Sequence, residues 1–481
     1  MTELRRTVQS YIDETPVWRD GTATGQVQMT AMQWRIWLLA SAGKFFEGMI
    51  VFMTGVALPL MVKEFGLSAT EKGVVSAAPL AGIMLGTLML GGMADTHGRR
   101  PVFVIEIAAL ALFLVGLALS PNLPLVVVCL FGVGIALGCD YPTAHLVISE
   151  SIASQNRGKL VLGAFAFQAV GALAGTALGY LILANLADVG AWRWMYATAI
   201  VPALAVLVGR LTICESGQWL ASKGRRAEAE AAIASLLERE PPYPRHIRLK
   251  EHAARAHAGR NDGWGSLLTL PTRRAMILAS VPWFLQDLGT YGIGLFTPTI
   301  LAKTVGHEYD FARNISAVIQ RDMLAAKGAA LIDVLLIVGI VAAVFLADRV
   351  GRIKLQVIGF IGCAAGLALA MLSQQTAEPW RTLILFGGFM LFNFMTNVGP
   401  NAQTYLLAGE VFPTHLRGKG AGFAAAAGKV GAVLTAFLFP LLLAGFGVNV
   451  LLAMLIGTSL LGAALTWRFR IETAGIDLEQ I

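Results

Sequence analysis

Long apolar runs separated by short polar segments dominate the chain. Several runs exceed about 18 residues, the length at which an apolar segment indicates a membrane-spanning helix rather than a core helix. The pattern therefore predicts an all-α membrane protein with twelve transmembrane helices. The predicted spans are 34–62, 74–94, 102–121, 123–149, 159–184, 192–213, 274–302, 326–347, 354–373, 381–408, 419–442 and 447–469.

The longest polar stretch separates the first six spans from the last six. Its segment ESGQWLASKGRRAEAEAAIASLLERE predicts a short amphipathic helical region with a basic start. We interpret it as a tether on the membrane surface rather than as a separate domain. The predicted units are an N-terminal segment (1–33), a six-helix bundle (34–213), a linker (214–273), a second six-helix bundle (274–470) and a tail (471–481).

Composition and charge distribution agree with a polytopic membrane protein. The chain is 56% hydrophobic and 14% charged, whereas soluble domains average about 25% charged residues. Basic residues gather in the loops on one side of the predicted spans, so the formal charge of +7 indicates membrane topology rather than nucleic-acid binding. The bias places both termini in the cytoplasm, and we expect a plasma membrane, of the bacterial inner-membrane type. The polar stretch before about Met29 lacks the apolar region of a signal peptide.

The sequence contains no pattern that indicates a metal, a cofactor or an enzyme. Its cysteines have neither CxxC nor His-paired spacing, so a disulfide and a zinc site are not expected. It also contains no nucleophile elbow and no GxxxxGK[ST] phosphate loop. The cysteines are Cys129, Cys139, Cys214 and Cys363.

Two loop motifs occur once in each half of the chain. GGMADTHGRR at 91–100 returns as VFLADRVGRI at 344–353, and Glu150 with RGK at 157–159 returns as Glu410 with RGK at 417–419. Parallel six-helix repeats about an axis along the membrane normal are one transporter architecture. The repeated motifs therefore support two related halves.

The repeated motifs carry charges that can hold two helix bundles together in one conformation and release them in another. In the first copy an aspartate ends a helix, Gly98 permits a tight turn, and two arginines can pair with acids or helix ends. The alternative is a simple turn with arginines on the cytoplasmic side. The candidate gating residues are Asp95, Arg99, Arg100, Glu150, Arg157, Asp348, Arg352, Glu410 and Arg417.

The segment 281–301 is apolar enough to cross a bilayer, yet it carries polar side chains at helical spacing. Trp283, Asp287 and Tyr291 follow each other at i, i+4 and i+8, which puts them on one helix face over roughly 12 Å. An aspartate in a span costs about 2.5–3.5 kcal/mol on insertion scales and usually faces a cavity or a partner. We interpret this face as a ligand-binding surface with a titratable centre; the alternative is a packed polar contact between helices.

Other charges also lie well inside apolar runs. Glu47, Asp140, Asp287 and Lys429 would together cost on the order of 10 kcal/mol if they faced lipid. We expect them to share a polar chamber between the halves, with Lys429 as the one cation deep in a span. A carboxylate in such a chamber can load and release a proton. The alternatives are a structural hydrogen bond for Glu47 and a buried ion pair for Lys429.

The loop motifs resemble those of the major facilitator superfamily, in its sugar-porter-like and organic-ion branches. The segments GGMADTHGRRPVFV, LADRVGRIK, CESGQWLASKGRRAEA and GEVFPTHLRGKGAG carry this resemblance, which covers about residues 34–470. It implies two six-helix bundles around a central cavity and transport by alternating access. It says little about the substrate.

Five helix segments resemble the phosphate:proton symporters of that superfamily: GCDYPTAHLVISE, FQAVGALAG, WFLQDLGTYG, GPNAQTYLLAGEVFPT and AAGKVGA. The resemblance implies a coupling or binding role for Asp287, and we assign proton coupling to the buried carboxylates Glu47, Asp140 and Asp287. The substrate-binding residues that it implies are Asp140, Tyr141, Gln168, Trp283, Asp287, Tyr291, Asn401 and Lys429.

The first predicted span departs from the phosphate:proton pattern. Where these symporters show two aspartates one turn apart, as in GFFTDAYD, this chain has GKFFEGMI, with Glu47 at the first position and Ile50 at the second. Lys44 adds a charge that the pattern lacks. The substrate class therefore stays open on this evidence.

The leading hypothesis is a monomeric, proton-coupled transporter of a small polar metabolite, an anion such as inorganic phosphate or an organic acid. A second hypothesis keeps the fold and makes the substrate an organic cation or a zwitterion. A third is a receptor on the same fold that binds its ligand without net transport. The expected partners are the small-molecule substrate, protons and the lipid bilayer.

Overall fold

The structure is a computed structural model of the chain. It describes residues 6–15, 28–90, 93–154, 157–186, 188–238, 247–249, 270–305, 315–412 and 417–473. Within these ranges the structure describes only the backbone of four residues that were predicted to gate or to bind: Asp95, Tyr141, Asp348 and Arg417.

The first half consists of long helices that begin and end at recognisable capping residues. Thr30 and Gln33 form a reciprocal capping box at the first of them, and the Asn122 side chain accepts a hydrogen bond from the Leu125 backbone N–H, which satisfies amides that have no partner within the helix. The helices are α2 (Ala31–Phe65), α3 (Ala69–Leu90), the short α4 (Met93–His97), α5 (Arg99–Ala118), α6 (Leu123–Ser151), α7 (Arg157–Asn185) and α8 (Ala191–Leu211).

The second half repeats this pattern with two interruptions. A backbone break at Gly399 and Pro400 divides the span predicted at 381–408 into two helices, because proline cannot donate the helical hydrogen bond. A non-helical Gly447 (φ 79°) bends the last helix. The elements are α11 (Leu270–Val305), α12 (Ile315–Val350), α13 (Arg352–Leu372), η3 (Ser373–Gln375), α14 (Trp380–Val398), α15 (Pro400–Glu410) and α16 (Arg417–Arg468).

Within the described residues, nine helices are long and apolar enough to cross a membrane. One of them, α16, joins two helices across the bend at Gly447. Two further helices, α3 and α11, are 22 and 36 residues long. The all-α membrane fold is confirmed, and its helices are consistent with the predicted twelve spans.

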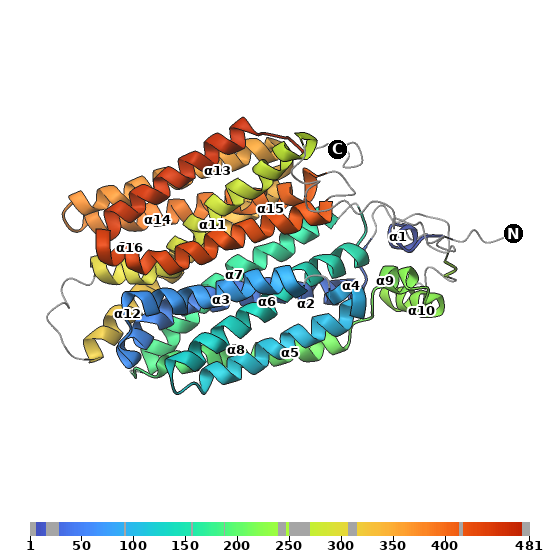
Figure 1. The fold of residues 1–481 in the computed structure, drawn as a ribbon, viewed down its shortest axis with the longest axis horizontal. Coiled ribbons are helices and arrows are strands. Elements are labelled where there is room, and N and C mark those ends of the chain that lie inside the picture. The colour runs from blue at the N-terminus through green and yellow to red at the C-terminus, as the bar shows by residue number, and fades with distance from the viewer. Residues whose placement is uncertain are drawn as a thin grey trace.

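The helices form two bundles that lie side by side (Figure 1). Contacts between the bundles run mainly through α2 with α11, α3 with α16, and α7 with α12, and α2 also meets α12. Close approach depends on glycine within the first bundle, where a Cβ at Gly171 would overlap the Phe45 carbonyl oxygen and one at Gly82 the Phe131 carbonyl oxygen.

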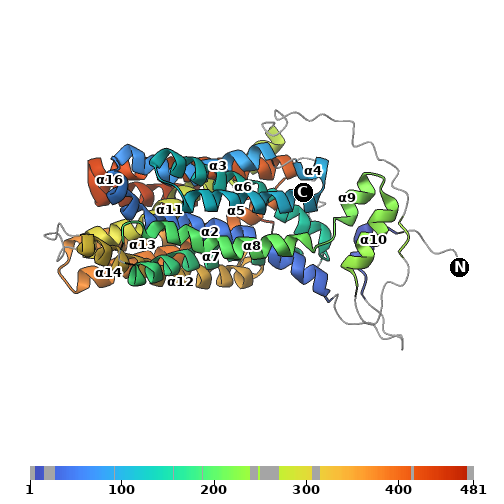
Figure 2. The same cartoon turned by 90° about the horizontal axis from the view of Figure 1, so that it is seen from below.

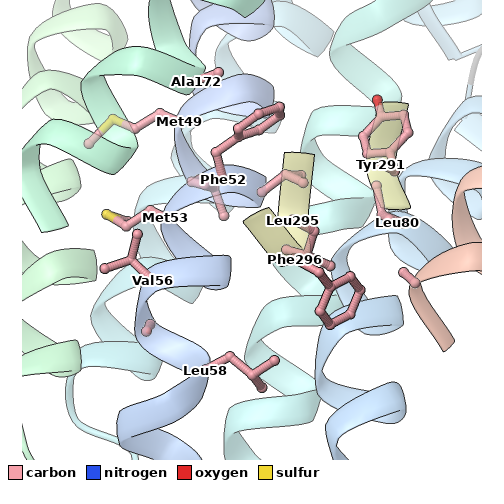
Figure 3. Close-up of a cluster of buried hydrophobic side chains, with 14 of the residues drawn as sticks. Met49, Phe52, Met53, Val56, Leu58, Leu80, Ala172, Tyr291, Leu295 and Phe296 are labelled. Carbon is pink, nitrogen blue, oxygen red and sulfur yellow. The ribbon is translucent and has the colours of Figure 1, made fainter. Parts of the chain in front are cut away.

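A cluster of buried apolar side chains seals part of the contact between α2 and α11. Figure 3 shows Phe52 of α2 beside Leu295 and Phe296 of α11, with Tyr291 at the edge of the group. A Cβ at Gly55 would overlap the Leu295 carbonyl oxygen, so the two backbones touch here. The hydroxyl of Tyr291 leaves this apolar layer and enters the polar centre described below.

Three short helices lie together at one end of the molecule, which we call the α9–α10 end (Figures 1 and 2). They are α1 (Val8–Ile12), α9 (Gly217–Ser222) and α10 (Arg226–Leu236). Tyr11 and Ile233 belong to one buried cluster that also includes Ile36 of α2. The linker helices therefore pack against the first bundle.

Candidate functional site

The predicted face of α11 is buried at the centre of the molecule. Trp283, Asp287 and Tyr291 all lie in the interior, and all three line one cavity. Asp287 is only 2% exposed. The helical spacing of these residues thus presents a continuous polar strip to a cavity between the halves.

Glu47 of α2 connects four helices through its carboxylate. Its Oε1 accepts hydrogen bonds from Lys429 Nζ (2.9 Å) and from the Tyr291 hydroxyl (2.8 Å). Its Oε2 accepts one from Lys44 Nζ (2.5 Å). The amide of Gln168 on α7 completes this group, with Nε2 at 3.2 Å from the Tyr291 hydroxyl. The carboxylate is thus held between two ammonium groups.

Asp287 is held much more loosely than Glu47. Its Oδ2 lies 3.9 Å from Lys429 Nζ, which is too long for a hydrogen bond. That oxygen is buried without a hydrogen-bond partner among the described residues. An unsatisfied carboxylate oxygen at a cavity wall can accept a proton or meet a polar group of a ligand.

The cavity is small, with about 20 Å³ of room for the centre of a water molecule. Basic, acidic, amide and aromatic side chains converge on it, which is typical of a site for a small polar ligand. The lining residues are Lys44, Ile83, Thr87, Phe165, Gln168, Trp283, Asp287, Tyr291, Asn401, Ala425 and Lys429.

Six of the eight predicted substrate-binding residues line this cavity: Gln168, Trp283, Asp287, Tyr291, Asn401 and Lys429. Glu47, predicted for proton coupling, accepts hydrogen bonds from three of them, Gln168, Tyr291 and Lys429. Lys44 also belongs to the lining, although the sequence pattern did not assign it to the site. The sequence did contain a signal for Lys44, because a charged residue one turn before Glu47 interrupts an apolar run.

Asp140 lies in a different cluster, inside the first bundle. Its Oδ1 accepts a hydrogen bond from Arg210 Nη2, and Arg210 Nη1 also bonds Glu106 Oε1 at 2.9 Å. Arg210 is fully buried, with 0% exposure. We call Glu106, Asp140 and Arg210 the buried triad. The structure therefore separates Asp140 from the chamber that it was expected to share with Glu47, Asp287 and Lys429.

The buried triad shows that more charged residues lie inside the spans than the sequence analysis expected. Lys429 is not the one cation inside the spans, because Arg210 and Lys44 are buried too. Glu106 lies in the run VFVIEIAAL and Arg210 in AVLVGRLTI. Both are single charges in apolar surroundings, so the criterion that singled out Glu47 applies equally to them.

At the α9–α10 end, Arg99 and Glu150 form a two-pronged ion pair, with Nε to Oε2 at 3.0 Å and Nη2 to Oε1 at 2.7 Å. Ser216 Oγ donates to the same carboxylate at 2.5 Å. Glu215 accepts hydrogen bonds from the Arg99 and Arg100 backbone amides at the start of α5. An acidic side chain at a helix N-terminus is favoured by the exposed amides and the helix dipole.

The second half carries the same cluster with matching partners. Arg352 pairs with Glu410, with Nε to Oε2 at 3.1 Å, and Thr473 Oγ1 donates to Glu410 Oε2 at 2.6 Å. Glu472 accepts from the Arg352 backbone amide at 2.9 Å. The pair Glu472–Thr473 repeats Glu215–Ser216 after 257 residues, a signal that the motif comparison missed.

The two clusters bring together five of the predicted gating residues: Arg99, Arg100, Glu150, Arg352 and Glu410. Arg157 is half-buried, and its Nε has no hydrogen-bond partner in the described part of the chain. The roles of Asp95, Asp348 and Arg417 stay predictions, since their side chains are not described.

Comparison with known protein families gives one match over nearly the whole chain. Residues 36–481 match the family described as "Sugar (and other) transporter". The putative metabolite transport protein YaaU of Escherichia coli K12 is 27% identical over 463 residues, which cover 94% of this chain and 95% of that protein. The putative inorganic phosphate transporter C1683.01 of Schizosaccharomyces pombe is 26% identical and covers 94% of this chain and 88% of that one.

Comparison with solved structures agrees on the fold. The xylose transporter XylE from E. coli, in an inward-open conformation, superposes with a TM-score of 0.74 at 20% sequence identity. The match covers 93% of this chain and 98% of XylE.

Proposed function

Because the chain belongs to the sugar (and other) transporter family, within the major facilitator superfamily, we propose that it carries a small anion together with protons. The anion is inorganic phosphate or an organic acid, and transport proceeds by alternating access of the central cavity. The chain is a polytopic membrane transporter and not an enzyme.

The balance of charges at the cavity is the observation that supports anion–proton symport. Two lysines, Lys44 and Lys429, face two carboxylates, Glu47 and Asp287. Their charges sum to zero when all four groups are ionised. When a proton binds either carboxylate, a positive charge is left without a partner in a buried site. An anion restores neutrality there, and burying uncompensated charge is costly. Proton and anion are therefore stabilised together.

Asp287 is our candidate for the coupling carboxylate. Its Oδ2 has no hydrogen-bond partner among the described residues, whereas Glu47 accepts hydrogen bonds from two lysines. Protonation of Asp287 breaks no hydrogen bond at that oxygen and removes a negative charge 3.9 Å from Lys429 Nζ, which favours an anionic substrate there. Glu47 and Asp140 remain further candidates for proton coupling.

Aromatic rings on the cavity wall favour an organic acid as an alternative to phosphate. Two rings of the lining, Phe165 and Trp283, pack on Tyr405, which is not itself a lining residue: Phe165 stacks on it with ring centroids 4.6 Å apart, and Trp283 meets it edge-on at 6.4 Å. Flat apolar walls beside two lysines suit a carboxylate on an apolar body.

The names of similar proteins are compatible with both substrate classes. They include putative inorganic phosphate transporters of yeast and plants, putative metabolite transport proteins of bacteria, and XylE, which is described as a proton:xylose symporter. We extend proton coupling to this chain as part of the proposal.

We further propose that the protein is a monomer in a plasma membrane of the bacterial inner-membrane type, with both termini in the cytoplasm. Arg99, Arg100 and Arg352 lie at the α9–α10 end, and excess Arg and Lys in short loops favours the cytoplasmic side.

Transport is expected to depend on the proton gradient. The purified protein is first screened by thermal shift against inorganic phosphate, aromatic acids and organic cations, because binding stabilises the folded state. Uptake of each stabilising compound is then measured in proteoliposomes. It should rise when an inward-directed pH gradient is imposed and collapse when a protonophore is added. Unchanged uptake under both conditions would rule out proton coupling.

Replacing Glu410 by glutamine is expected to slow net uptake about tenfold while equilibrium binding stays within a few-fold. The change weakens hydrogen bonds from Arg352 and Thr473 that are remote from the cavity lining, and such charge-assisted bonds contribute about 1.5–3 kcal/mol. Uptake rates and binding affinity are measured on the same preparation. Glu228→Gln makes the matched change in an exposed pair with Arg225 and should leave both quantities unaltered. Loss of binding in well-folded Glu410→Gln would contradict a gating role.

A further inference from the structure

Asp333 is a buried carboxylate that the central site does not use. It lies on α12, in the run ALIDVLLIV, and is only 2% exposed. Its Oδ2 meets Thr176 Oγ1 of α7 at 3.1 Å, and its Oδ1 accepts a hydrogen bond from Asn393 Nδ2 of α14 at 3.2 Å. Because α7 belongs to the first half and α12 to the second, Asp333 joins the two bundles.

No ion pair links Asp333 to a cation within the described part of the chain. The helices packed against α12 are α7, α14, α11, α13, α2 and α15. Their uncharged titratable side chains are Tyr180, one turn beyond Thr176; Tyr291 and Tyr405; and Cys363, whose Sγ contacts the Phe392 carbonyl at 3.9 Å. On α12 itself, Asp322 precedes Asp333 by about three turns and Lys327 is exposed.

The charged side chains of the six neighbouring helices lie in the central site, in the gating cluster or near helix ends. Among the described side chains they are Lys44, Glu47 and Asp287; Arg352 and Glu410; and Arg35, Lys63, Glu64, Arg157, Lys159, Arg273, Arg274, Lys354 and Arg381.

The hydrogens around Thr176 favour a neutral Asp333 in this conformation. The single hydroxyl hydrogen of Thr176 has three acceptors near it: the carbonyl oxygens of Ala172 and Leu173, each at 3.1 Å, and Asp333 Oδ2. If Asp333 carries a proton on Oδ2, it donates to Thr176, and Thr176 donates to its own helix. If Asp333 is ionised, Thr176 must leave its helix carbonyls, and an unpaired charge remains buried, which is costly.

Amide side chains lie in a row from Asp333 toward the central cavity, although no hydrogen bond joins Asn393 to Asn397 among the described residues. Asn393 lies one turn before Asn397 on α14, and Asn397 Oδ1 accepts from Asn401 Nδ2 at 2.6 Å. Asn401 Oδ1 in turn accepts from Gln286 Nε2 at 3.1 Å, and Gln286 precedes Asp287. Polar side chains therefore extend from the contact between the halves toward the cavity wall.

We propose that Asp333 is a second proton-binding site, which holds α7 against α12 when protonated and loosens that contact when ionised. The inference rests on the proposed alternating-access function. Opening of the contact admits water to the carboxylate and favours its ionised form, so acidic pH should favour the joined state. The site thereby couples proton binding to the movement of the halves, independently of Asp287.

Electron–electron distance measurements between two spin labels test this site. The labels replace exposed Leu181 of α7 and Leu324 of α12 in a background without the four native cysteines, and no substrate or gradient is present. At acidic pH the native site should give one short-distance population. Raising the pH should add a longer-distance population. Asp333→Asn, which keeps hydrogen-bonding groups but cannot ionise, should lose at least half of this pH response.

Three controls separate proton binding from a structural hydrogen bond. Asp188→Asn makes the same acid-to-amide change at an exposed position and should keep the full pH response. Thr176→Val removes the partner of Asp333 on α7 and should add the longer distance even at acidic pH. Asp333→Ser serves as a second neutral variant, so that a folding defect of the asparagine variant does not decide the outcome.

A full pH response in the folded neutral variants, or no pH response in the native site, would overturn the inference. Infrared difference spectra of the native protein between acidic and alkaline pH give an independent reading, since one protonated-carboxyl band should vanish on alkalisation and be absent in Asp333→Asn. Failure of the uptake assay would overturn the proposed function alone, because these measurements contain neither substrate nor gradient.

Discussion

Replacing Lys429 by alanine is expected to weaken anion binding by about ten- to a hundredfold. Lys429 is 8% exposed as a residue, and its ammonium group lies within hydrogen-bonding distance of Glu47 and Tyr291, at 2.9 and 2.6 Å. A charge-assisted contact from it to an anion contributes roughly 1.5–3 kcal/mol, and each 1.4 kcal/mol is about tenfold in affinity. Isothermal titration with inorganic phosphate, or with the acid that the thermal-shift screen identifies, measures the change.

Asp287→Asn should separate binding from coupling at the same site. The asparagine keeps a polar group of the same size and can donate a hydrogen bond, as the protonated acid does. Anion affinity should therefore be largely retained, while accumulation driven by a pH gradient is lost. The measurement is binding and gradient-driven uptake on one preparation, with folding checked by monodispersity.

The order of the two effects distinguishes an anion from a cation as the substrate. A cation would be attracted by Asp287 and repelled by Lys429, so Asp287→Asn would cost affinity and Lys429→Ala would cost little or improve it. Lys63→Ala, on the exposed end of the same helix as Glu47, controls for the loss of a lysine elsewhere. Undiminished binding in Lys429→Ala together with lost binding in Asp287→Asn would refute the anion proposal.

Much of the central site could be predicted because charge inside an apolar run has a clear physical meaning. Glu47, Asp287 and Lys429 each carry a cost in lipid that only a polar cavity or a partner removes, and the structure brings these three together. Helical spacing correctly indicated that Trp283, Asp287 and Tyr291 share one face.

Partner choice could not be predicted, because it depends on helix rotation and on which helices are neighbours. Asp140 shows the same sequence signal as Asp287, yet α5, α6 and α8 pack so that Arg210 reaches it inside the first bundle. Removing Asp140 from the cavity and adding Lys44 changes the balance of charges there from three acids and one lysine to two of each. That change favours an anion over the cation that the sequence allowed equally well.

The repeated gating clusters show a different limit of prediction from sequence. Glu472 and Thr473 follow α16, the last helix, just as Glu215 and Ser216 follow α8, the last helix of the first bundle. Two residues in a short polar segment are too few to form a recognisable sequence repeat. Their equivalence becomes visible when both carboxylates are seen at a helix N-terminus. The bends at Gly399 and Gly447 likewise depend on backbone angles, which apolar patterning does not encode.

Replacing Arg210 by methionine is expected to destabilise the protein by about 3–5 kcal/mol, the range found when one partner of a buried ion pair is removed. The guanidinium is shared by Glu106 and Asp140 and also donates to the Phe103 and Leu39 carbonyl oxygens, at 2.7 and 3.1 Å. Without it, two carboxylates remain buried within one bundle. The midpoint of thermal unfolding in detergent should fall clearly.

Neutralising the two acids should recover most of that loss. In the triple variant Arg210→Met, Asp140→Asn, Glu106→Gln no charge remains in the buried triad, and the methionine still packs against the Phe103 ring, over which the Arg210 guanidinium lies at 3.4 Å. Replacing a buried ion-pair cluster by uncharged groups of similar volume is often neutral or stabilising. A triple variant as unstable as Arg210→Met alone would mean that the lost backbone hydrogen bonds and packing, rather than uncompensated charge, cause the defect. Recovery of stability without recovery of proton-driven uptake would assign Asp140 or Glu106 a part in coupling, in addition to holding α5, α6 and α8 together.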